Sequence, residues 1–461
     1  MPFRQRLLRN LVLLSLFWLT GFDLSQCSLF DSSDGDSSGG SSGDRVRIRV
    51  QGEQKISTEK GNFSGDLNNG DQFGSAIAGP GDLESDGVRD LAVGAPYMDG
   101  DGTDRGGIWI LFMDDNGRVD LEQKISGNSG GFDGNLDDGD LFGSALAGIG
   151  DLNGDGAFDL VAGAPQDDEG GSDRGAVWGL FLNDQGRVRD EQKIADGAGG
   201  FSGDLDDSDR FGSAVAEIGD VDGDGVPDLA VGVPQDAGDV TGPGEVWILF
   251  LNAEGKVRDE QKIAKDAGGF DGNLDDGDRF GSAVARLGDL NGDGTPDIAV
   301  GAPGDAGNGA GRGAVWILFL DSGGRVRDEQ KIADGAGGFE GDLHDGDQFG
   351  SALAGIDNFG GGKSTGLVVG APDDDDGAEN AGAVWVLFPG TFGRVDAWQK
   401  ISPDAGNFDG DLDAGDHFGA AVAGIGDLDN NGTVDLAVGA PGDDDGGSDK
   451  GATWILFMRA D

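Results

Sequence analysis

Residues 142–165 read FGSALAGIGDLNGDGAFDLVAGAP, and related copies of this stretch recur along the 461-residue chain. A Gly-Ala-Pro or close variant follows each Phe-Gly after 21 residues, and a tryptophan and a Gln-Lys-Ile keep the same period. A fixed repeat of this length indicates one supersecondary unit that is copied and then stacked or closed into a ring. The Phe-Gly pairs lie 69 residues apart, at Phe73, Phe142, Phe211, Phe280, Phe349 and Phe418.

Each 69-residue unit predicts four strands. In the second unit, Phe142–Ile149 alternates small and apolar residues, and Asp159–Ala164 is a short apolar run that stops before a proline. Gly175–Leu182 is rich in apolar residues, and Arg187–Ile194 is more polar. Four short strands with glycine-rich connections are typical of a β-propeller blade. No segment has helical periodicity, so we predict an all-β fold.

The two ends of the array complement each other. The array opens at Arg45 with a lone fourth-strand motif, Glu53–Ile56, and closes at Asp461 just after a third strand. If the first segment pairs with the last blade, the ring closes and leaves no open sheet edge between them. We therefore predict a six-bladed propeller of four-stranded antiparallel blades over residues 45–461, with the six repeated tryptophans packed between blades.

The connection between the first and second strands predicts a cation site. In the second unit it runs from Asp151 to Asp159, with side-chain oxygens at loop positions 1, 3, 5 and 9. A backbone carbonyl at position 7 adds another oxygen, and the glycine at position 6 permits a sharp bend. This all-oxygen set suits calcium better than magnesium, which requires a stricter octahedron, or softer metals, which prefer His or Cys.

Five of the six units carry this loop, so we predict about five Ca²⁺ ions. The fifth unit has Asn358, Gly360, Gly362 and Gly366 at the same positions and is expected to bind none. The predicted ligands are Asp82, Glu84, Asp86 and Asp90 in the first unit, Asp151, Asn153, Asp155 and Asp159 in the second, Asp220, Asp222, Asp224 and Asp228 in the third, Asp289, Asn291, Asp293 and Asp297 in the fourth, and Asp427, Asp429, Asn431 and Asp435 in the sixth.

Phe-Gly, the cation loop and Gly-Ala-Pro, in this order, resemble the FG-GAP repeats of the integrin α-subunit propeller and its bacterial relatives. The resemblance covers Arg45 to Asp461. It implies that the calcium loops are mainly structural and lie on the face opposite the ligand face. Integrin propellers have seven blades, whereas this chain supplies six, so integrin-type adhesion serves here as an analogy.

The N-terminal segment does not belong to the array. Residues 1–26 are predicted to be a secretory signal, because arginines precede the apolar run Leu11–Leu19. The sequence around Cys27 resembles a bacterial lipoprotein cleavage box, with Cys27 as the lipidated residue; the alternative is an ordinary signal cleaved nearby. Residues 27–44 then form a flexible Ser/Gly/Asp tether. The protein is thus expected to be extracytoplasmic, either a cell-surface or outer-membrane lipoprotein or a secreted protein.

Composition excludes some partners. With 87 acidic and 32 basic residues, the formal charge is −55. Such a surface repels nucleic acid and anionic lipid head groups, so we expect no nucleic-acid partner and membrane contact only through the N-terminal lipid. The same charge predicts bound cations, because the unneutralised body would repel itself.

Other features leave alternatives open. The loops before each Phe-Gly, such as Phe132–Asp140, are either a second cation set or a solvated acidic rim. His344 and His417 are predicted to be exposed surface histidines, and Trp398 to be a packing substitution.

Three functions fit the sequence. We expect a calcium-binding recognition or adhesion module for an extracellular protein or polysaccharide. The alternatives are an extracellular hydrolase or lyase built on a propeller, and a purely structural envelope protein. No catalytic constellation is recognisable in the sequence, so the protein is predicted not to be an enzyme.

Overall fold

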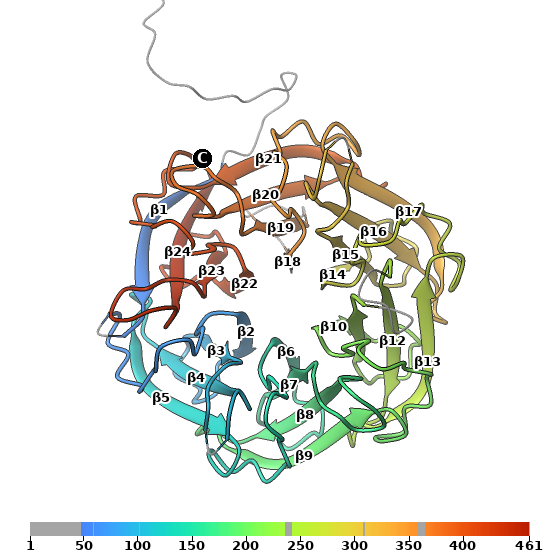
Figure 1. The fold of residues 1–461 in the computed structure, drawn as a ribbon, viewed down its shortest axis with the longest axis horizontal. Helices are drawn as coiled ribbons and strands as arrows, with labels where there is room; N and C mark the ends of the chain where they lie inside the picture. The colour runs from blue at the N-terminus through green and yellow to red at the C-terminus, as the bar shows by residue number, and fades with distance from the viewer. Residues whose placement is uncertain are drawn as a thin grey trace, which may run out of the picture. The chain divides into compact units, whose positions relative to one another are not determined.

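The computed structural model describes residues 48–460, apart from residues 59, 101, 236–241, 308, 358 and 360–364. The predicted signal, tether and Cys27 lie outside the described residues. In the described part, strands form six four-stranded antiparallel sheets arranged as blades of a propeller (Figure 1). The predicted all-β, six-bladed propeller is therefore confirmed. None of the helices among the described residues is long and apolar enough to span a membrane.

The blades repeat one strand pattern. The first blade consists of β2 (Ala76–Gly81), β3 (Asp90–Ala95), β4 (Gly107–Met113) and β5 (Val119–Ser126). The others are β6 (Ala145–Gly150), β7 (Asp159–Ala164), β8 (Ala176–Leu182) and β9 (Val188–Ala195); β10 (Ala214–Gly219), β11 (Asp228–Val233), β12 (Glu245–Leu251) and β13 (Val257–Ala264); β14 (Ala283–Gly288), β15 (Asp297–Ala302), β16 (Ala314–Leu320) and β17 (Val326–Ala333); β18 (Ala352–Ile356), β19 (Gly366–Ala371), β20 (Ala383–Pro389) and β21 (Val395–Ile401); and β22 (Ala421–Gly426), β23 (Asp435–Ala440) and β24 (Ala452–Ala460), with β1 (Ile48–Ile56).

The N-terminal strand completes the last blade, as predicted. The sixth sheet has the order β1-β24-β23-β22, and β1 runs antiparallel to β24 from the pair Ile48–Ala460 to the pair Ile56–Thr453. The innermost strand of each blade packs against that of the next, and β22 packs against β2. Figure 1 shows β1, in blue, beside β24, in red. The ring is therefore closed by strand pairing between the two ends of the propeller.

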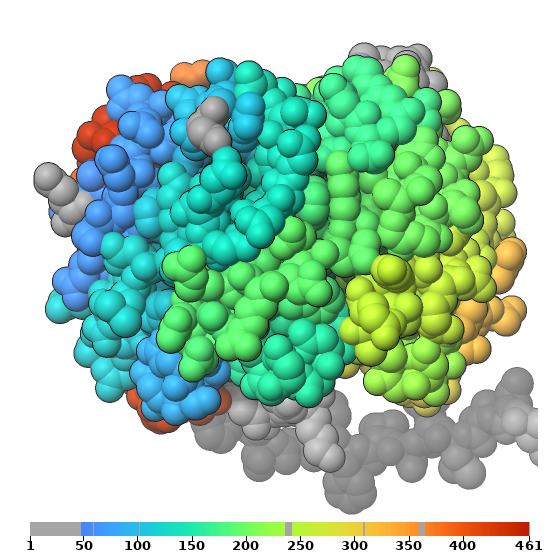
Figure 2. Space-filling view, turned by 90° about the horizontal axis from the view of Figure 1, so that it is seen from below, coloured from blue at the N-terminus to red at the C-terminus, as the bar shows by residue number. Residues whose placement is uncertain are grey.

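The hydrophobic core is divided among the junctions between blades. Each of six clusters of buried residues draws side chains from two neighbouring blades, and each contains one repeated tryptophan. Trp178 of the second blade, for example, shares a cluster with Ile108 and Ile110 of the first. Its ring meets Phe132 edge-on at a centroid distance of 5.1 Å. The tryptophans thus pack between blades, as predicted, and Figure 2 shows successive blades side by side from blue through green to yellow.

The Phe-Gly pair joins blades instead of opening a strand. The predicted strand began at Phe142, but β6 begins at Ala145. The Phe142 N–H donates to the carbonyl of Arg105 in the preceding blade at 3.0 Å. Gly143 has a φ of 90°, which favours glycine, and its N–H donates to the Gly163 carbonyl at 2.9 Å. The predicted strand start was therefore wrong by three residues, because Phe142 pairs with the preceding blade and β6 begins only at Ala145.

The connections of each blade emerge at two opposite ends. Because the strands are antiparallel, the loops between first and second strands share one end with the turns between third and fourth strands. We call this end the cation-loop face. The loops after Gly-Ala-Pro and those before Phe-Gly share the other end, which we call the Phe-Gly face. A loop after Gly-Ala-Pro bonds to the loop before the next Phe-Gly; for example, the Gly139 N–H donates to the Thr103 carbonyl at 3.0 Å.

Candidate cation loops and the opposite face

The five predicted cation loops share one local conformation. In the second blade, the two carboxylate oxygens of Asp151 accept N–H groups from Asp155 and Gly156, both at 2.9 Å. Asn153 Oδ1 also accepts the Asp155 N–H, at 2.8 Å. The side chains at loop positions 1, 3 and 5 are exposed or half-exposed. These bonds turn the short acidic side chains toward the loop interior, where a cation would lie.

The aspartate at position 9 fixes the loop to the blade. Asp159 is 1% exposed, and its two oxygens accept N–H groups from Leu152, at 3.0 Å, and from Leu182 of the third strand, at 3.1 Å. Burial raises the pKa of Asp159 to about 6, although these N–H donors act in the opposite direction. The same two bonds recur at Asp90, Asp228, Asp297 and Asp435. The aspartate at position 9 therefore also anchors the loop to the third strand, a role that was not predicted from the sequence.

The side-chain oxygens converge most closely in two loops. One oxygen from each of Asp220, Asp222 and Asp224 lies within 4.8 Å of the others, and the same holds for Asp427, Asp429 and Asp435. Among the described residues, these are the groups of three acidic side chains that could share a metal ion. All donors are hard oxygens, so the chemistry fits calcium, with carbonyl oxygens and water completing the six to eight ligands.

The other predicted loops hold fewer converging carboxylates. The second and fourth loops carry Asn153 and Asn291 at position 3, and the first carries the longer Glu84. Their oxygens have the same hydrogen-bond pattern around position 1, with Asp86 N–H on Asp82 at 3.0 Å and Asp293 N–H on Asp289 at 2.9 Å. The structure therefore supports a shared loop conformation for all five. Asn358, Gly360 and Gly362 of the fifth unit lie outside the described residues.

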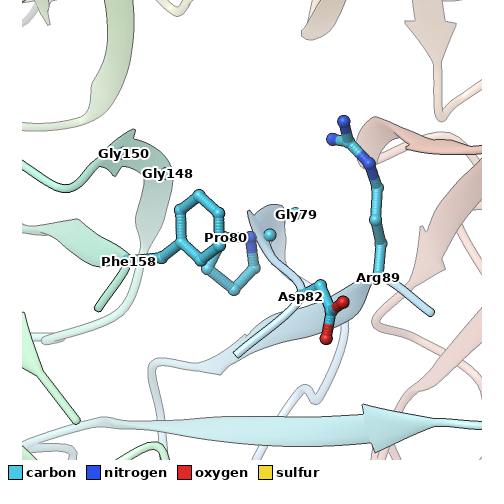
Figure 3. Close-up of a pocket in the computed structure, with 8 residues that line it drawn as sticks. Gly79, Pro80, Asp82, Arg89, Gly148, Gly150 and Phe158 are labelled. Atoms are coloured by element: carbon cyan, nitrogen blue, oxygen red, sulfur yellow. The ribbon is translucent and has the colours of Figure 1, made fainter. Parts of the chain in front are cut away.

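A small pocket lies beside the first cation loop. It has a volume of about 240 Å³ and lies between the ends of β2 and β6, where Asp82, Arg89 and Phe158 line it together with glycines and Pro80. Figure 3 shows the Phe158 ring next to Pro80, with Asp82 and Arg89 on the other side. A Cβ atom on Gly81 would lie 2.8 Å from the Phe158 ring, so glycine allows this ring to rest on the neighbouring blade.

On the Phe-Gly face, lysines pair with buried carboxylates in the loops after Gly-Ala-Pro. The lysine of each Gln-Lys-Ile lies over the repeated tryptophan, with Nζ 5.1–5.7 Å from the ring centroid. Lys193 Nζ lies 2.8 Å from the buried Asp167, and Lys400 Nζ lies 2.7 Å from the buried Asp374. Lys331 pairs with Asp305, and Lys55 with Asp443, in the same way. An ammonium group thus compensates the buried carboxylates near these loops, and the described loops hold no group of three acidic side chains close enough to share a metal.

Six residues that precede the Phe-Gly pairs break the repeat. We call them the pre-Phe residues: Gln72, Leu141, Arg210, Arg279, Gln348 and His417. Each adopts a left-handed backbone conformation, with φ between 53° and 60°, which glycine would adopt at lower cost. None is glycine, although the chain contains 92 glycines. Non-glycine residues kept in strained conformations are often found at functional positions, so their side chains are candidates for recognition.

A hydrogen-bonded chain links three blades at this end. Arg279 Nη2 donates to Gln348 Oε1 at 2.7 Å, and Gln348 Nε2 donates to Asp373. Asp373 Oδ1 lies 2.9 Å from His417 Nδ1. Since Arg279 and Gln348 are one repeat apart, pre-Phe residues of neighbouring blades meet at the inner part of the ring. His344 is exposed, as predicted, and the side chain of His417 is partly exposed, at 38%, with Nδ1 held by Asp373, a partner that was not predicted.

The Asp373–His417 pair predicts a pH dependence. The hydrogen bond that His417 donates to the Asp373 carboxylate raises the pKa of His417 above its usual value, and burial opposes this only in part. A raised folded-state pKa means that the pair stabilises the fold fully below the ordinary histidine pKa, about 6.5, and that this stabilisation is lost as the pH rises through the folded-state value. An NMR titration of His417 should show the raised pKa, and Asp373→Asn should lower it toward 6.5. A His417 pKa that does not respond to Asp373→Asn would contradict this assignment.

Sequence reasoning missed Arg210, Arg279, Gln348 and Asp373. The available signal was the contrast between these positions and their neighbours, because each interrupts a nearly identical repeat next to an invariant Phe-Gly or Gly-Ala-Pro. Trp398 was recognised correctly as a packing residue, since it lies 5.3 Å from Trp385 and 5.8 Å from Phe339 between ring centroids.

Comparison with known proteins agrees with the motifs. Residues 142–180, 211–249 and 280–318 match the FG-GAP repeat. Integrin alpha-PS5 of Drosophila melanogaster is 39% identical over 155 residues, which cover 33% of this chain and 14% of that protein. Phosphatidylinositol-glycan-specific phospholipase D of Bos taurus is 34% identical over 174 residues, which cover 37% of this chain and 20% of that protein. The similarity thus spans a fifth or less of the length of these relatives.

One solved structure is similar over most of the chain. A crystal structure of a Bacteroides caccae protein of unknown function aligns with a TM-score of 0.38 and 12% identity, covering 78% of this chain and 96% of that one. A likeness of this degree carries no conclusion about function.

Proposed function

Because the chain is an FG-GAP repeat protein related to integrin α subunits and to phosphatidylinositol-glycan-specific phospholipase D, we propose that it is a calcium-stabilised recognition or adhesion module. Calcium binds in the five loops of the cation-loop face, at the twenty side chains predicted from the sequence. An extracellular protein or polysaccharide binds on the Phe-Gly face. Neither nucleic acid nor a lipid head group is a partner, because the chain carries a formal charge of −55.

One observation carries this proposal, namely that cation loops and pre-Phe residues lie on opposite faces. The loops of the cation-loop face are nearly the same in five of the six blades and bond mainly to themselves and to their own blade. The six pre-Phe positions hold four residue types, and the side chains of Arg279 and His417 bond to side chains of a neighbouring blade. Loops with the same residues in successive blades can stabilise each blade in the same way. Recognition of one ligand, by contrast, requires different side chains around the ring.

We propose binding in preference to catalysis. The side chains that differ on the Phe-Gly face are mostly arginine and glutamine, which suit hydrogen bonding to a ligand. His417 is already engaged by Asp373, and that carboxylate also accepts a hydrogen bond from Gln348. The pair is thus part of a structural network between blades.

A binding screen tests the recognition function. The folded, calcium-loaded protein is screened against surface glycans and extracellular proteins, and a saturable ligand is expected. Arg279→Ala should weaken its binding by about tenfold or more, as loss of a central arginine contact does. Arg327→Ala is the matched control, because Arg327 is 70% exposed on the outer strand β17. Equal binding by Arg279→Ala and the parent, or no saturable ligand at all, would contradict the proposal.

We also propose that the protein is exported and held at the cell surface by lipid on Cys27. This proposal is supported by the charged and apolar pattern of residues 1–26 and by the single cysteine of the chain. Cys27→Ser should abolish labelling by a radioactive fatty acid and release the protein into the soluble extracytoplasmic fraction. Membrane retention of Cys27→Ser equal to that of the parent would overturn lipid anchoring and leave the secreted alternative.

A further inference from the structure

The third cation loop holds a positive charge. Arg258, on the outer strand β13, places Nη2 2.8 Å from Asp222 and 2.5 Å from Asp224. These two carboxylates occupy loop positions 3 and 5. The Arg258 Nε donates to the carbonyl of Leu251 at 2.8 Å, and the Leu251 N–H donates to Asp228 at 3.2 Å. Arg258 is therefore bonded both to the loop and to the strand that anchors it.

The reason lies in the pair of side chains at loop positions 3 and 5. In the fourth loop, Asn291 Nδ2 donates to Asp293 at 3.1 Å, and in the sixth loop Asn431 Nδ2 donates to Asp429 at 2.9 Å. In these loops, the amide donates a hydrogen bond to the neighbouring carboxylate, which therefore needs no added cation. In the third loop Asp222 and Asp224 are both acceptors, so neither can bond to the other while both are ionised. Arg258 donates to both and removes their mutual repulsion.

The equivalent arginine of the fourth blade behaves differently. Arg327 is 70% exposed and pairs at 2.6 Å with Asp321 in the turn between the third and fourth strands. The side chain of Arg258, by contrast, is 38% exposed. The two blades offer an arginine at the same repeat position. They differ in the loop, where Asp222 replaces Asn291, and in the turn, where Asn252 replaces Asp321.

We infer that Arg258 is a built-in competitor of calcium in the third cation loop. It occupies the carboxylates at positions 3 and 5 when calcium is absent and must leave them, in whole or in part, when the ion binds. The third blade therefore has a weaker calcium site than its three carboxylates alone would give, and its loop keeps its conformation when calcium is withdrawn. This inference rests on the proposed calcium binding and adds a graded response among the blades.

Stepwise calcium constants test the inference. The metal-free protein is titrated with calcium in competition with a chromophoric chelator. In Arg258→Ala, one macroscopic constant should tighten by about tenfold, which is the effect of removing two partly exposed ion pairs. Arg327→Ala should leave all constants as in the parent. In an Asp222→Asn background, Arg258→Ala should have no further effect, since the amide can satisfy Asp224 as Asn291 satisfies Asp293.

Thermal stability in excess chelator gives an independent readout. Arg258→Ala should melt at a lower temperature than the parent, because Asp222 and Asp224 then repel each other without a counterion. Arg327→Ala should melt as the parent does. Unchanged calcium constants in Arg258→Ala, or equal changes in Arg327→Ala, would overturn the inference while calcium binding itself stands. A parent protein that binds no calcium would overturn both the inference and the calcium part of the proposed function.

Discussion

A variant that lacks residues 48–56 is expected to lose the cooperative melting transition of the parent protein. This segment is β1, which pairs with β24 along its length and buries Ile48, Val50 and Ile56 almost completely. Each such side chain contributes about 1.5–3 kcal/mol by burial. Without β1, the ring also lacks its closing strand and β24 becomes an exposed sheet edge, which favours aggregation. Differential scanning calorimetry measures the effect directly.

Two controls separate ring closure from simple shortening. A protein that lacks only residues 1–44 retains β1 and is expected to melt like the parent. A synthetic peptide of residues 48–56, added to the truncated protein, should restore part of the transition by pairing with β24. If the protein without residues 48–56 melted at the temperature of the parent, closure by β1 would not be important for stability.

Removing calcium is expected to lower the melting temperature by at least about 5 °C. A ligand that binds only the folded state at one hundred times its Kd stabilises it by about 2.7 kcal/mol per site. For a large domain, 1 kcal/mol corresponds to about 2–4 °C. Several occupied loops should therefore give a clear shift, with the carboxylates of Asp427, Asp429 and Asp435 left in mutual repulsion.

The control for chelation is refilling with defined metals. Calcium should restore the original melting temperature, and magnesium should restore less of it, because magnesium requires an octahedral set that these loops do not impose. An unchanged melting temperature for protein shown to be metal-free would contradict a stabilising role for the ion.

The fold could be predicted from the sequence because the same strand and turn motifs recur in each blade. Strand boundaries such as Asp159–Ala164 follow from apolar runs that end at Gly-Ala-Pro in the same register in each blade. The error at Phe142 arose because an apolar residue before small residues looks like the start of a strand. Phe142 instead pairs with Gly106 of the preceding blade, and the spacing of apolar residues does not predict such a contact.

The candidate site was only partly predictable for the same physical reason. Residues within one loop, such as Asp151 and Asp155, are linked by local spacing, so the sequence identified them together. The bond from Leu182 to Asp159 crosses to another strand, and Arg258 reaches Asp222 across 36 positions. The chain from Arg279 to His417 depends on the packing of consecutive blades, which brings different repeats together. Pattern analysis detects spacing within one repeat, whereas these contacts join strands or blades that are distant in the sequence.

Calcium binding by the repeated loops is tested most directly by calorimetric titration of the metal-free protein. The parent should bind about five ions in sites of this type, and Asp155→Ala about four, because the variant loses the ligand at position 5 of the second loop. Asp184→Ala, which removes an exposed charge from a turn of the same blade, should bind about five. Failure of the parent to bind calcium, or equal stoichiometry for Asp155→Ala and Asp184→Ala, would contradict the assignment of these loops as calcium sites.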